Sequence, residues 1–195
     1  MGPKTDNNTK IRLVAAALKV LAEQGYHKTS MKEIAREAGV AQGLINYYFP
    51  SKDDLMFEVF QMESLKYAEE MQRIADIPKG EHFIRHALEV PKGMVNAYPD
   101  WHRLRYELFA IGLRSEAGRQ KIKESLAAGR RLVHQYLDTS FSNNDHVNKS
   151  ALASIINAVI DGLALELMAD PNYDIEAAYL TFAELLEAYL SEGRR

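Results

Sequence analysis

The sequence of 195 residues contains no cysteine and no long, uninterrupted apolar run. Without cysteine, disulfides and thiolate metal sites are excluded, as is usual for a protein of a reducing compartment. No apolar run approaches the ~20 residues that a membrane span needs, which predicts no membrane partner. The first ten residues, MGPKTDNNTK, lack the apolar core of a secretory signal. These absences predict a cytoplasmic protein.

Strand patterns and catalytic motifs are also missing. No segment alternates convincingly between apolar and polar residues, so we expect no sheet. There is no nucleophile elbow, phosphate-binding glycine loop or zincin motif. His82 and His86 lie four residues apart with Glu89 one turn further, but no third and fourth metal ligand is evident, so surface histidines are the simpler interpretation. We therefore predict no metal, no cofactor and no enzymatic activity.

The charge is distributed unevenly along the chain, although the net charge is only −3. Residues 1–55 hold eight Lys and Arg against six Asp and Glu, whereas the remainder holds 16 against 21. A mildly basic N-terminal module on an acidic body is consistent with one end that docks on phosphate.

Apolar residues recur at helical spacing along most of the chain, so the sequence predicts an all-α fold. The polar residues 1–8 predict a loose arm. Predicted helices cover residues 10–24, 31–37, 42–49, a long helix from 51, and then 81–97, 100–113, 116–140, 147–169 and 175–192. Pro91 and Gly93 are expected to kink or split the helix at 81–97. The break before the helix at 147 is expected at residues 142–145.

The stretch from Ser30 to Lys52, SMKEIAREAGVAQGLINYYFPSK, has the pattern of a helix-turn-helix. Ser30 and Glu33 form a capping box that starts the first helix. Gly39 suits the left-handed turn between the two helices. The second helix places Ile45 and Phe49 on one face and is short enough to lie in the major groove of DNA.

This stretch strongly resembles the DNA-binding domain of TetR-family (tetracycline-repressor-like) transcriptional regulators. The resemblance runs from Leu13-Val14 through Gly25-Tyr26 to Leu55, and its most specific part is Phe49-Pro50-Ser51-Lys52. It implies a three-helix DNA-binding domain over residues 1–54. It also implies a helical ligand-binding and dimerisation domain over residues 55–195.

Candidate DNA contacts gather in and around the second helix of this motif. Gln42 suits adenine, Gly43 permits a close backbone approach, and Leu44 suits a thymine methyl. The remaining candidates contact bases or phosphates: Lys28, Thr29, Ser30, Asn46, Tyr47, Tyr48 and Lys52. Packing is an equal alternative for Tyr48, and a role as the helix cap is the alternative for Ser30. The family often has Tyr at position 46 and His at position 48, so base and phosphate contacts stay unassigned.

Lys52 opposes the dipole of the helix that it begins, and so gains nothing locally. A phosphate across that helix end explains the lysine, since backbone amides and the ammonium group bind it together. A tolerated surface lysine is the alternative.

The last two predicted helices are apolar around most of their circumference, which requires burial on several sides. In the resembling regulators the two final helices form a four-helix dimer interface. We therefore expect a homodimer; the alternative is the centre of a monomeric core. The predicted interface consists of Ile156, Val159, Ile160, Leu163, Phe182, Leu186 and Tyr189.

The middle helices are rich in aromatic and soft side chains, whose usual fate is the core. The resemblance implies that some of them line a cavity for a small-molecule effector, and their mixed character favours a hydrophobic or amphipathic ligand. The candidates are Met94, Trp101, Tyr106, Phe109, His134 and Met168.

The sequence thus predicts a dimeric DNA-binding regulator, a repressor that a small ligand releases from its operator. A ligand-independent regulator or an activator is the alternative within DNA binding. A helical enzyme or small-molecule carrier with a vestigial helix-turn-helix is the alternative from another class.

Overall fold

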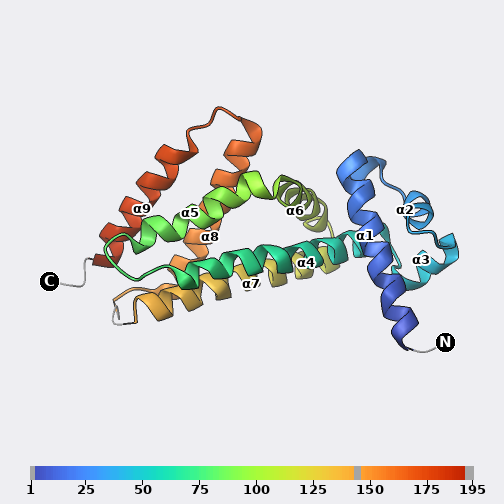
Figure 1. Ribbon diagram of the computed structural model, residues 1–195, viewed down its shortest axis with the longest axis horizontal. Coiled ribbons are helices and arrows are strands. Elements are labelled where there is room, and N and C mark those ends of the chain that lie inside the picture. Colours follow the sequence, from blue (N-terminus) through green and yellow to red (C-terminus); the bar gives the residue numbers. More distant parts are fainter. Residues whose placement is uncertain (1–2, 143–145, 192–195) are drawn as a thin grey trace.

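The computed structural model describes residues 3–142 and 146–191, and every regular element in these ranges is helical. The predicted all-α fold is confirmed. Figure 1 shows a small N-terminal lobe joined by the long helix α4 to a larger helical body. The elements are α1 (Pro3–Lys28), α2 (Met31–Glu37), α3 (Gln42–Tyr48), α4 (Lys52–Met71), the 3-10 helix η1 (Gln72–Asp76), α5 (Phe83–Ala97), α6 (Pro99–Gly112), α7 (Glu116–Ser140), α8 (Lys149–Ala169) and α9 (Ile175–Ser191).

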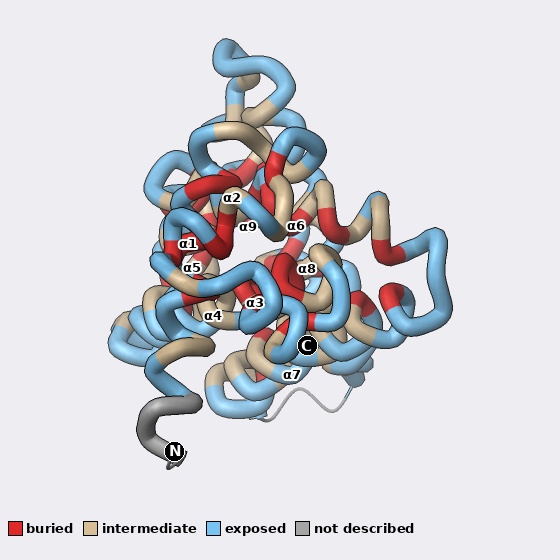
Figure 2. The backbone as a smooth tube through the Cα atoms, turned by 90° about the vertical axis from the view of Figure 1, so that its right-hand side faces the viewer, coloured by how far each residue is buried: buried red, intermediate tan, exposed pale blue. Residues whose placement is uncertain are grey.

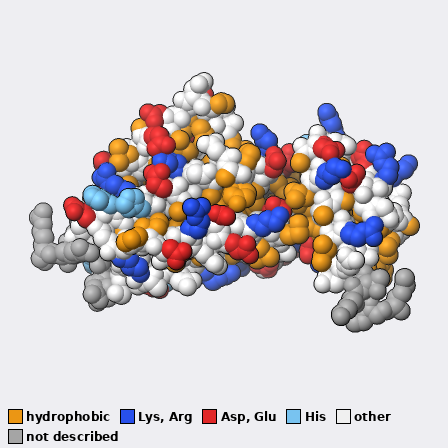
Figure 3. Space-filling model, in the orientation of Figure 1, with side chains coloured by type: hydrophobic (Ala, Val, Ile, Leu, Met, Phe, Trp, Pro, Cys, Tyr) orange, Lys and Arg blue, Asp and Glu red, His pale blue; other side chains and the backbone are white. Residues whose placement is uncertain are grey.

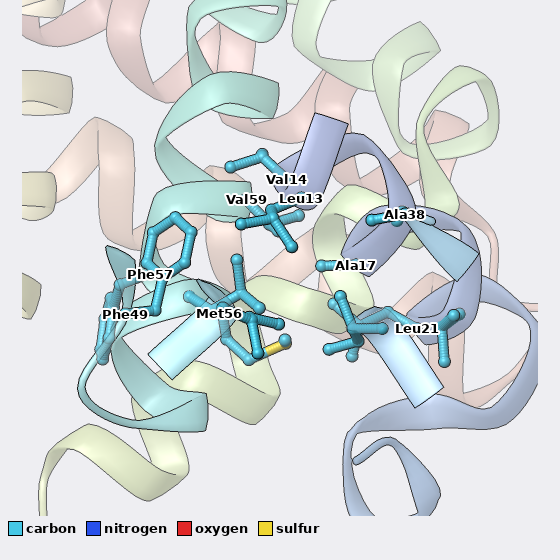
Figure 4. Close-up of a cluster of buried hydrophobic side chains, with 14 of the residues drawn as sticks. Leu13, Val14, Ala17, Leu21, Ala38, Phe49, Met56, Phe57 and Val59 are labelled. Atoms are coloured by element: carbon cyan, nitrogen blue, oxygen red, sulfur yellow. The ribbon is translucent and has the colours of Figure 1, made fainter. Parts of the chain in front are cut away.

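The N-terminal lobe has a core that includes the first two turns of α4. Leu13 and Ala17 of α1 and Ile34 of α2 are completely or almost completely buried, together with Ile45 of α3. Figure 4 shows this cluster, in which Met56 and Val59 of α4 pack beside the side chains of α1. The same cluster contains Leu104 and Leu108 of α6. Burial of this apolar surface therefore holds α4 and α6 against the DNA-binding helices.

Two glycines set the turns of the N-terminal lobe. Gly39, between α2 and α3, has φ +64°, the left-handed conformation predicted for it. Gly25 has φ +73° and interrupts α1, three residues before that helix ends at Lys28. The capping box predicted at Ser30 is present, because the Ser30 hydroxyl accepts from the Glu33 amide and the Glu33 carboxylate accepts from the Ser30 amide.

Two predictions about the helices are wrong. Helix α1 begins at Pro3 rather than at residue 10, since proline is well suited to a first helical turn. Helix α5 runs unbroken through Pro91 and Gly93, although Pro91 cannot donate to the carbonyl of Ala87. Helix α4 ends at Met71 and passes into η1. The predicted break at 142–145 falls largely on residues 143–145, outside the described residues.

The body consists of helices α5 to α9 packed around the far end of α4. Helix α7 lies along α4 in Figure 1 and packs most extensively against α8, while α9 packs against α5. The α6–α7 turn is tight, because a Cβ on Gly118 would lie 2.5 Å from Gly112 Cα. This packing brings α7 close to the start of α4.

Helix α8 is apolar enough and, at 21 residues, long enough to cross a membrane by length and composition. Counting only uninterrupted apolar runs in the sequence therefore did not single out this helix. Only 22% of its most apolar stretch is buried within the chain. Asn157 and Asp161 lie in this helix. Much of the apolar surface of α8 is therefore exposed on the single chain.

Candidate functional site

The outer face of α3 is the most exposed part of the helix-turn-helix. Gln42, Gly43, Leu44, Asn46 and Tyr47 are all exposed, and Tyr47 reaches 76% exposure. Figure 2 looks onto this end of the molecule and shows α3 at the surface. Ile45 and Phe49 on the opposite face are buried in the lobe core. The helix therefore presents polar, apolar and aromatic side chains on a face free for base edges.

Most of the other predicted DNA contacts, before α2 and at the end of α3, are engaged in hydrogen bonds or packing within the chain. Thr29 is buried and its hydroxyl donates to Gly25 O at 2.8 Å. The Ser30 hydroxyl belongs to the capping box. Tyr48 is half-buried against the lobe core, with its ring edge-on to Tyr47. Lys28 is exposed, so it is the member of this group best placed for a phosphate. Figure 3 shows several Lys and Arg side chains over this lobe.

Lys52 has an intramolecular partner that the sequence does not reveal. Its ammonium group donates to Tyr26 O at 2.8 Å and to Thr29 O at 3.1 Å, and lies 3.9 Å from the centre of the Tyr26 ring. Lys52 therefore places its positive charge at the carbonyl end of α1, where the helix dipole favours it. Lys52 thus has an intramolecular explanation that the sequence analysis did not consider, and its phosphate contact stays a prediction.

The first turn of α4 links the DNA-binding lobe to the body. Tyr26 of α1 donates a hydrogen bond to Asp53, and burial followed by this bond raises the pKa of Tyr26. Lys121 of α7 donates to Asp54 at 2.7 Å, which lowers the pKa of that carboxyl group. Three consecutive residues of α4, from Lys52 to Asp54, thus contact α1 on one side and α7 on the other.

We expect Lys52→Ala to weaken DNA binding by loosening the junction of α1 and α4. The slope of log affinity against log salt concentration should stay at the wild-type value if Lys52 makes only its intramolecular contacts, because no phosphate contact is then lost. Lys28→Ala is the matched variant and should reduce the slope by about 0.9 for each phosphate contact removed. Filter-binding titrations over a salt series would measure both. If Lys52→Ala reduced the slope as much as Lys28→Ala, Lys52 would contact a phosphate.

Residues 13–59, which include the helix-turn-helix and the start of α4, match the profile of the family described as bacterial regulatory proteins, tetR family. Residues 13–59 belong to the DNA-binding segment of the TetR family. A curated relative, the fatty acid metabolism regulator protein of Bacillus subtilis, is 37% identical over 62 residues, but the match covers only 32% of each protein. The chain thus spans about a third of that relative's length. HTH-type transcriptional regulator PksA of Bacillus subtilis is 28% identical and matches across 87% of this chain and 84% of its own.

Solved structures extend the similarity to the body of the chain. The transcriptional regulator FadR of Bacillus subtilis, determined in complex with stearoyl-CoA, is 25% identical with a TM-score of 0.65. The superposition covers 90% of this chain and 96% of FadR. FadR of Bacillus halodurans, a fatty acid degradation regulator, has a TM-score of 0.69 at 23% identity, with 96% of each chain covered. The relatives are transcriptional regulators rather than enzymes.

The residues predicted to line a ligand cavity do not surround one space: Trp101, Tyr106 and Phe109 share α6, with Trp101 and Phe109 both beside Phe60, and the other three lie on other helices. Met94 is in the core, and His134 pairs with Asp138 at 3.0 Å on the surface of α7. Trp101 stacks on Tyr67, and Phe109 faces the Arg105 guanidinium. The Tyr106 hydroxyl donates to Asp161 O, and Met168 is half-buried.

The structure instead forms an apolar cavity of about 80 Å³ between the end of α4, η1 and helices α5, α7, α8 and α9. None of the six predicted residues lines it. Its walls are Met71, Ile74, Phe83, Ile84, Ala87, Leu88, Pro91, Val133, Tyr136, Leu137, Phe141, Ile156, Ile160, Leu186 and Leu190. The spacing of Phe83, Ala87 and Pro91 along one face of α5 is the signal in the sequence that indicates this wall.

The apolar cavity adjoins a larger groove of about 750 Å³ with a mixed polar and apolar lining. Phe83, Ile84, Phe141 and Leu190 line both spaces. The groove also contains charged and hydroxyl groups, from Lys79, Glu81, Ser140, Glu187 and Ser191. An apolar space next to a partly polar one suits an amphipathic molecule.

The predicted dimer residues divide into three groups by exposure. Ile156, Phe182 and Leu186 are buried in the core of the body, and Val159, Ile160 and Leu163 are half-buried against it. Of the predicted residues, Tyr189 is well exposed. The large apolar side chains exposed on α8 and α9 are Ile155, Leu165, Leu180, Leu185 and Tyr189, four of which the sequence did not single out.

Within the described residues, no group of three His, Asp or Glu side chains is close enough to hold a metal ion. His82 and His86 are both exposed, with ring centres 6.4 Å apart.

Proposed function

We propose that this protein is a cytoplasmic, homodimeric DNA-binding repressor that a small amphipathic ligand releases from its operator. The exposed face of α3, from Gln42 to Tyr47, is the observation that carries the proposal. It lies on a helix-turn-helix that matches the TetR family, and its opposite face is fixed in a packed core. The exposure of this face and the match to the TetR family thus support the same DNA-contacting surface.

Dimerisation is supported by the exposed apolar side chains of α8 and α9. A stable interface buries roughly 800 Å² on each partner. Ile155 and Leu185 are more than half exposed, and exposed apolar groups of this size rarely remain in contact with water as a contiguous surface. A twofold dimer also reads two half-sites, which a single seven-residue helix cannot do.

Effector binding is supported by the apolar cavity and the larger groove beside it. Helix α4 connects this cavity to the DNA-binding lobe, because Met71 lines the cavity and Lys52 contacts α1. A ligand that prefers one position of α4 changes the separation of the two recognition helices. Its different affinity for the two arrangements supplies the energy of release.

We expect stearoyl-CoA, the ligand in the solved FadR complex, to weaken operator binding at least ~5-fold. The operator would come from DNA that flanks the protein's own gene, in a mobility-shift assay. Ala87→Phe fills the apolar cavity and should abolish the ligand effect while leaving DNA binding intact. Ala97→Phe makes the same change at an exposed position at the end of α5 and should respond like the wild type. Ligand-independent affinity in the wild type would contradict this effector, and no DNA shift at all would contradict the repressor.

A further inference from the structure

A group of buried and half-buried polar side chains lies between helices whose neighbouring residues line the apolar cavity; Tyr179 of this group also lines a separate groove with Glu89. We call this group of side chains the buried polar cluster; it consists of Tyr67, His102, Arg105, Tyr106, Asp161 and Tyr179. These side chains come from α4, α6, α8 and α9, and α6 packs beside α4 in Figure 1. Tyr67 lies one helical turn from Met71 of the cavity wall, and Asp161 follows Ile160 of the same wall.

Three polar atoms of this cluster have no partner. Both ring nitrogens of His102 and the hydroxyl of Tyr179 are buried without a hydrogen bond, and in the described part of the chain no other side-chain atom has this property. His102 is 1% exposed and Tyr179 is 3% exposed. A buried polar atom without a partner costs roughly 1–3 kcal/mol, so folded proteins rarely leave three of them together.

The unpaired atoms share their neighbours. The His102 ring lies 5.8 Å from the Tyr67 ring and 6.5 Å from the Tyr106 ring, between centres. Tyr179 is close enough to Tyr67, Tyr106 and Asp161 for all three to influence its pKa. Tyr179 also packs in the same core as Leu88 and Ile156, which line the apolar cavity.

The cluster favours uncharged ligands. Arg105 and Asp161 form an ion pair, so their charges largely cancel. Burial, followed by the charge of Arg105, lowers the pKa of His102 to about 4, while burial raises the pKa of Tyr67 and Tyr179. At neutral pH His102 therefore offers one donor and one acceptor, and Tyr179 can act as either.

We propose that the buried polar cluster binds a neutral hydroxyl or carboxamide group of the effector, whose hydrocarbon part occupies the apolar cavity. In an acyl-CoA such groups are the amides next to the acyl chain, and its phosphates would lie outside the cluster. A group of this kind both donates and accepts, as His102 and Tyr179 require. A carboxylate only accepts and an ammonium only donates, and either would bury an unpaired charge. The inference rests on the effector cavity of the proposed function and adds the chemistry of the ligand's polar end.

The position of His102 gives this contact a route to the DNA-binding lobe. His102 lies on α6, whose Leu104 and Leu108 pack in the core that contains α1 to α3. A ligand group at His102 would therefore contact α6 less than two turns from Leu108, which packs in the core of the DNA-binding lobe.

The test uses four eight-carbon probes with the purified full chain at pH 7.5: 1-octanol, octanamide, octanoate and octylamine. We expect calorimetric affinities for 1-octanol and octanamide at least about tenfold higher than for the two charged probes. Tyr179→Phe and His102→Phe should each lower the affinity for 1-octanol by about tenfold. Tyr173→Phe, which removes a hydroxyl outside the cluster, should bind all four probes like the wild type.

Equal affinities for the four probes, or unchanged 1-octanol binding in both cluster variants, would overturn the inference and leave the apolar cavity standing. No binding by any probe would overturn both, whereas the DNA shift without ligand tests the repressor independently. Urea unfolding checks the variants themselves. Removing an unpaired atom should leave the unfolding midpoint at or above the wild-type value. A clearly lower midpoint for Tyr179→Phe would show that its hydroxyl is already paired, and would also overturn the inference.

Discussion

Leu185→Glu should produce a monomer with operator affinity lowered on the order of 100-fold, because two linked half-sites bind far more tightly than one. Leu185 is 64% exposed on α9, beside other exposed apolar side chains on α8 and α9. In a homodimer with twofold symmetry a glutamate there enters the interface twice, and each carboxylate loses water without gaining a partner. Light scattering after gel filtration measures the mass, and a mobility-shift titration measures the affinity.

Leu113→Glu is the matched control. Leu113 is 60% exposed in the α6–α7 turn, so the substitution adds the same charge at a similar exposure away from α8 and α9. It should remain dimeric and bind DNA like the wild type. If the Leu185→Glu protein remained dimeric, the dimer interface would have to lie on another surface.

The free energy of unfolding should fall by about 3 kcal/mol through His102 alone as the pH drops from about 6.5 to about 4. The folded protein holds the pKa of His102 near 4, against an ordinary value of 6.5, chiefly because the ring is buried. Within this range the unfolded chain binds a proton that the folded chain does not. The stability is fully present above pH 6.5 and declines as the pH falls, with no further loss through this residue below pH 4.

Comparison with His102→Phe isolates this contribution, since carboxyl groups titrate in the same range in both proteins. The charged and titratable neighbours of His102 are Arg105, Asp161, Tyr67 and Tyr106, and the variant retains all four. Urea titrations between pH 4 and 7 should give a shallower pH dependence for His102→Phe. Parallel curves would show that the His102 ring takes up its proton as readily in the folded state as in the unfolded chain.

The local features of the helix-turn-helix were predictable from neighbouring residues. The capping box of Ser30 and Glu33, the left-handed Gly39 and the cap of Ser51 on α4 depend on interactions within four residues. Their geometry follows from backbone hydrogen bonding and from the missing Cβ of glycine. The all-α fold and the family resemblance followed from the same local patterns.

The partners of polar and apolar side chains were decided by tertiary structure. Lys52 is paired with carbonyl groups 23 and 26 residues earlier in the chain. On α8 and α9 apolar residues surround the helix, so periodicity could not distinguish the buried Ile156 and Leu186 from the exposed Ile155 and Leu185. The walls of the apolar cavity and the unpaired atoms of His102 and Tyr179 come from helices far apart in sequence. The stretch from Ser30 to Lys52 by itself determined that this chain carries a DNA-binding motif, because caps and turns are local. The walls of the apolar cavity and the exposed apolar faces of α8 and α9 depended on packing between distant helices.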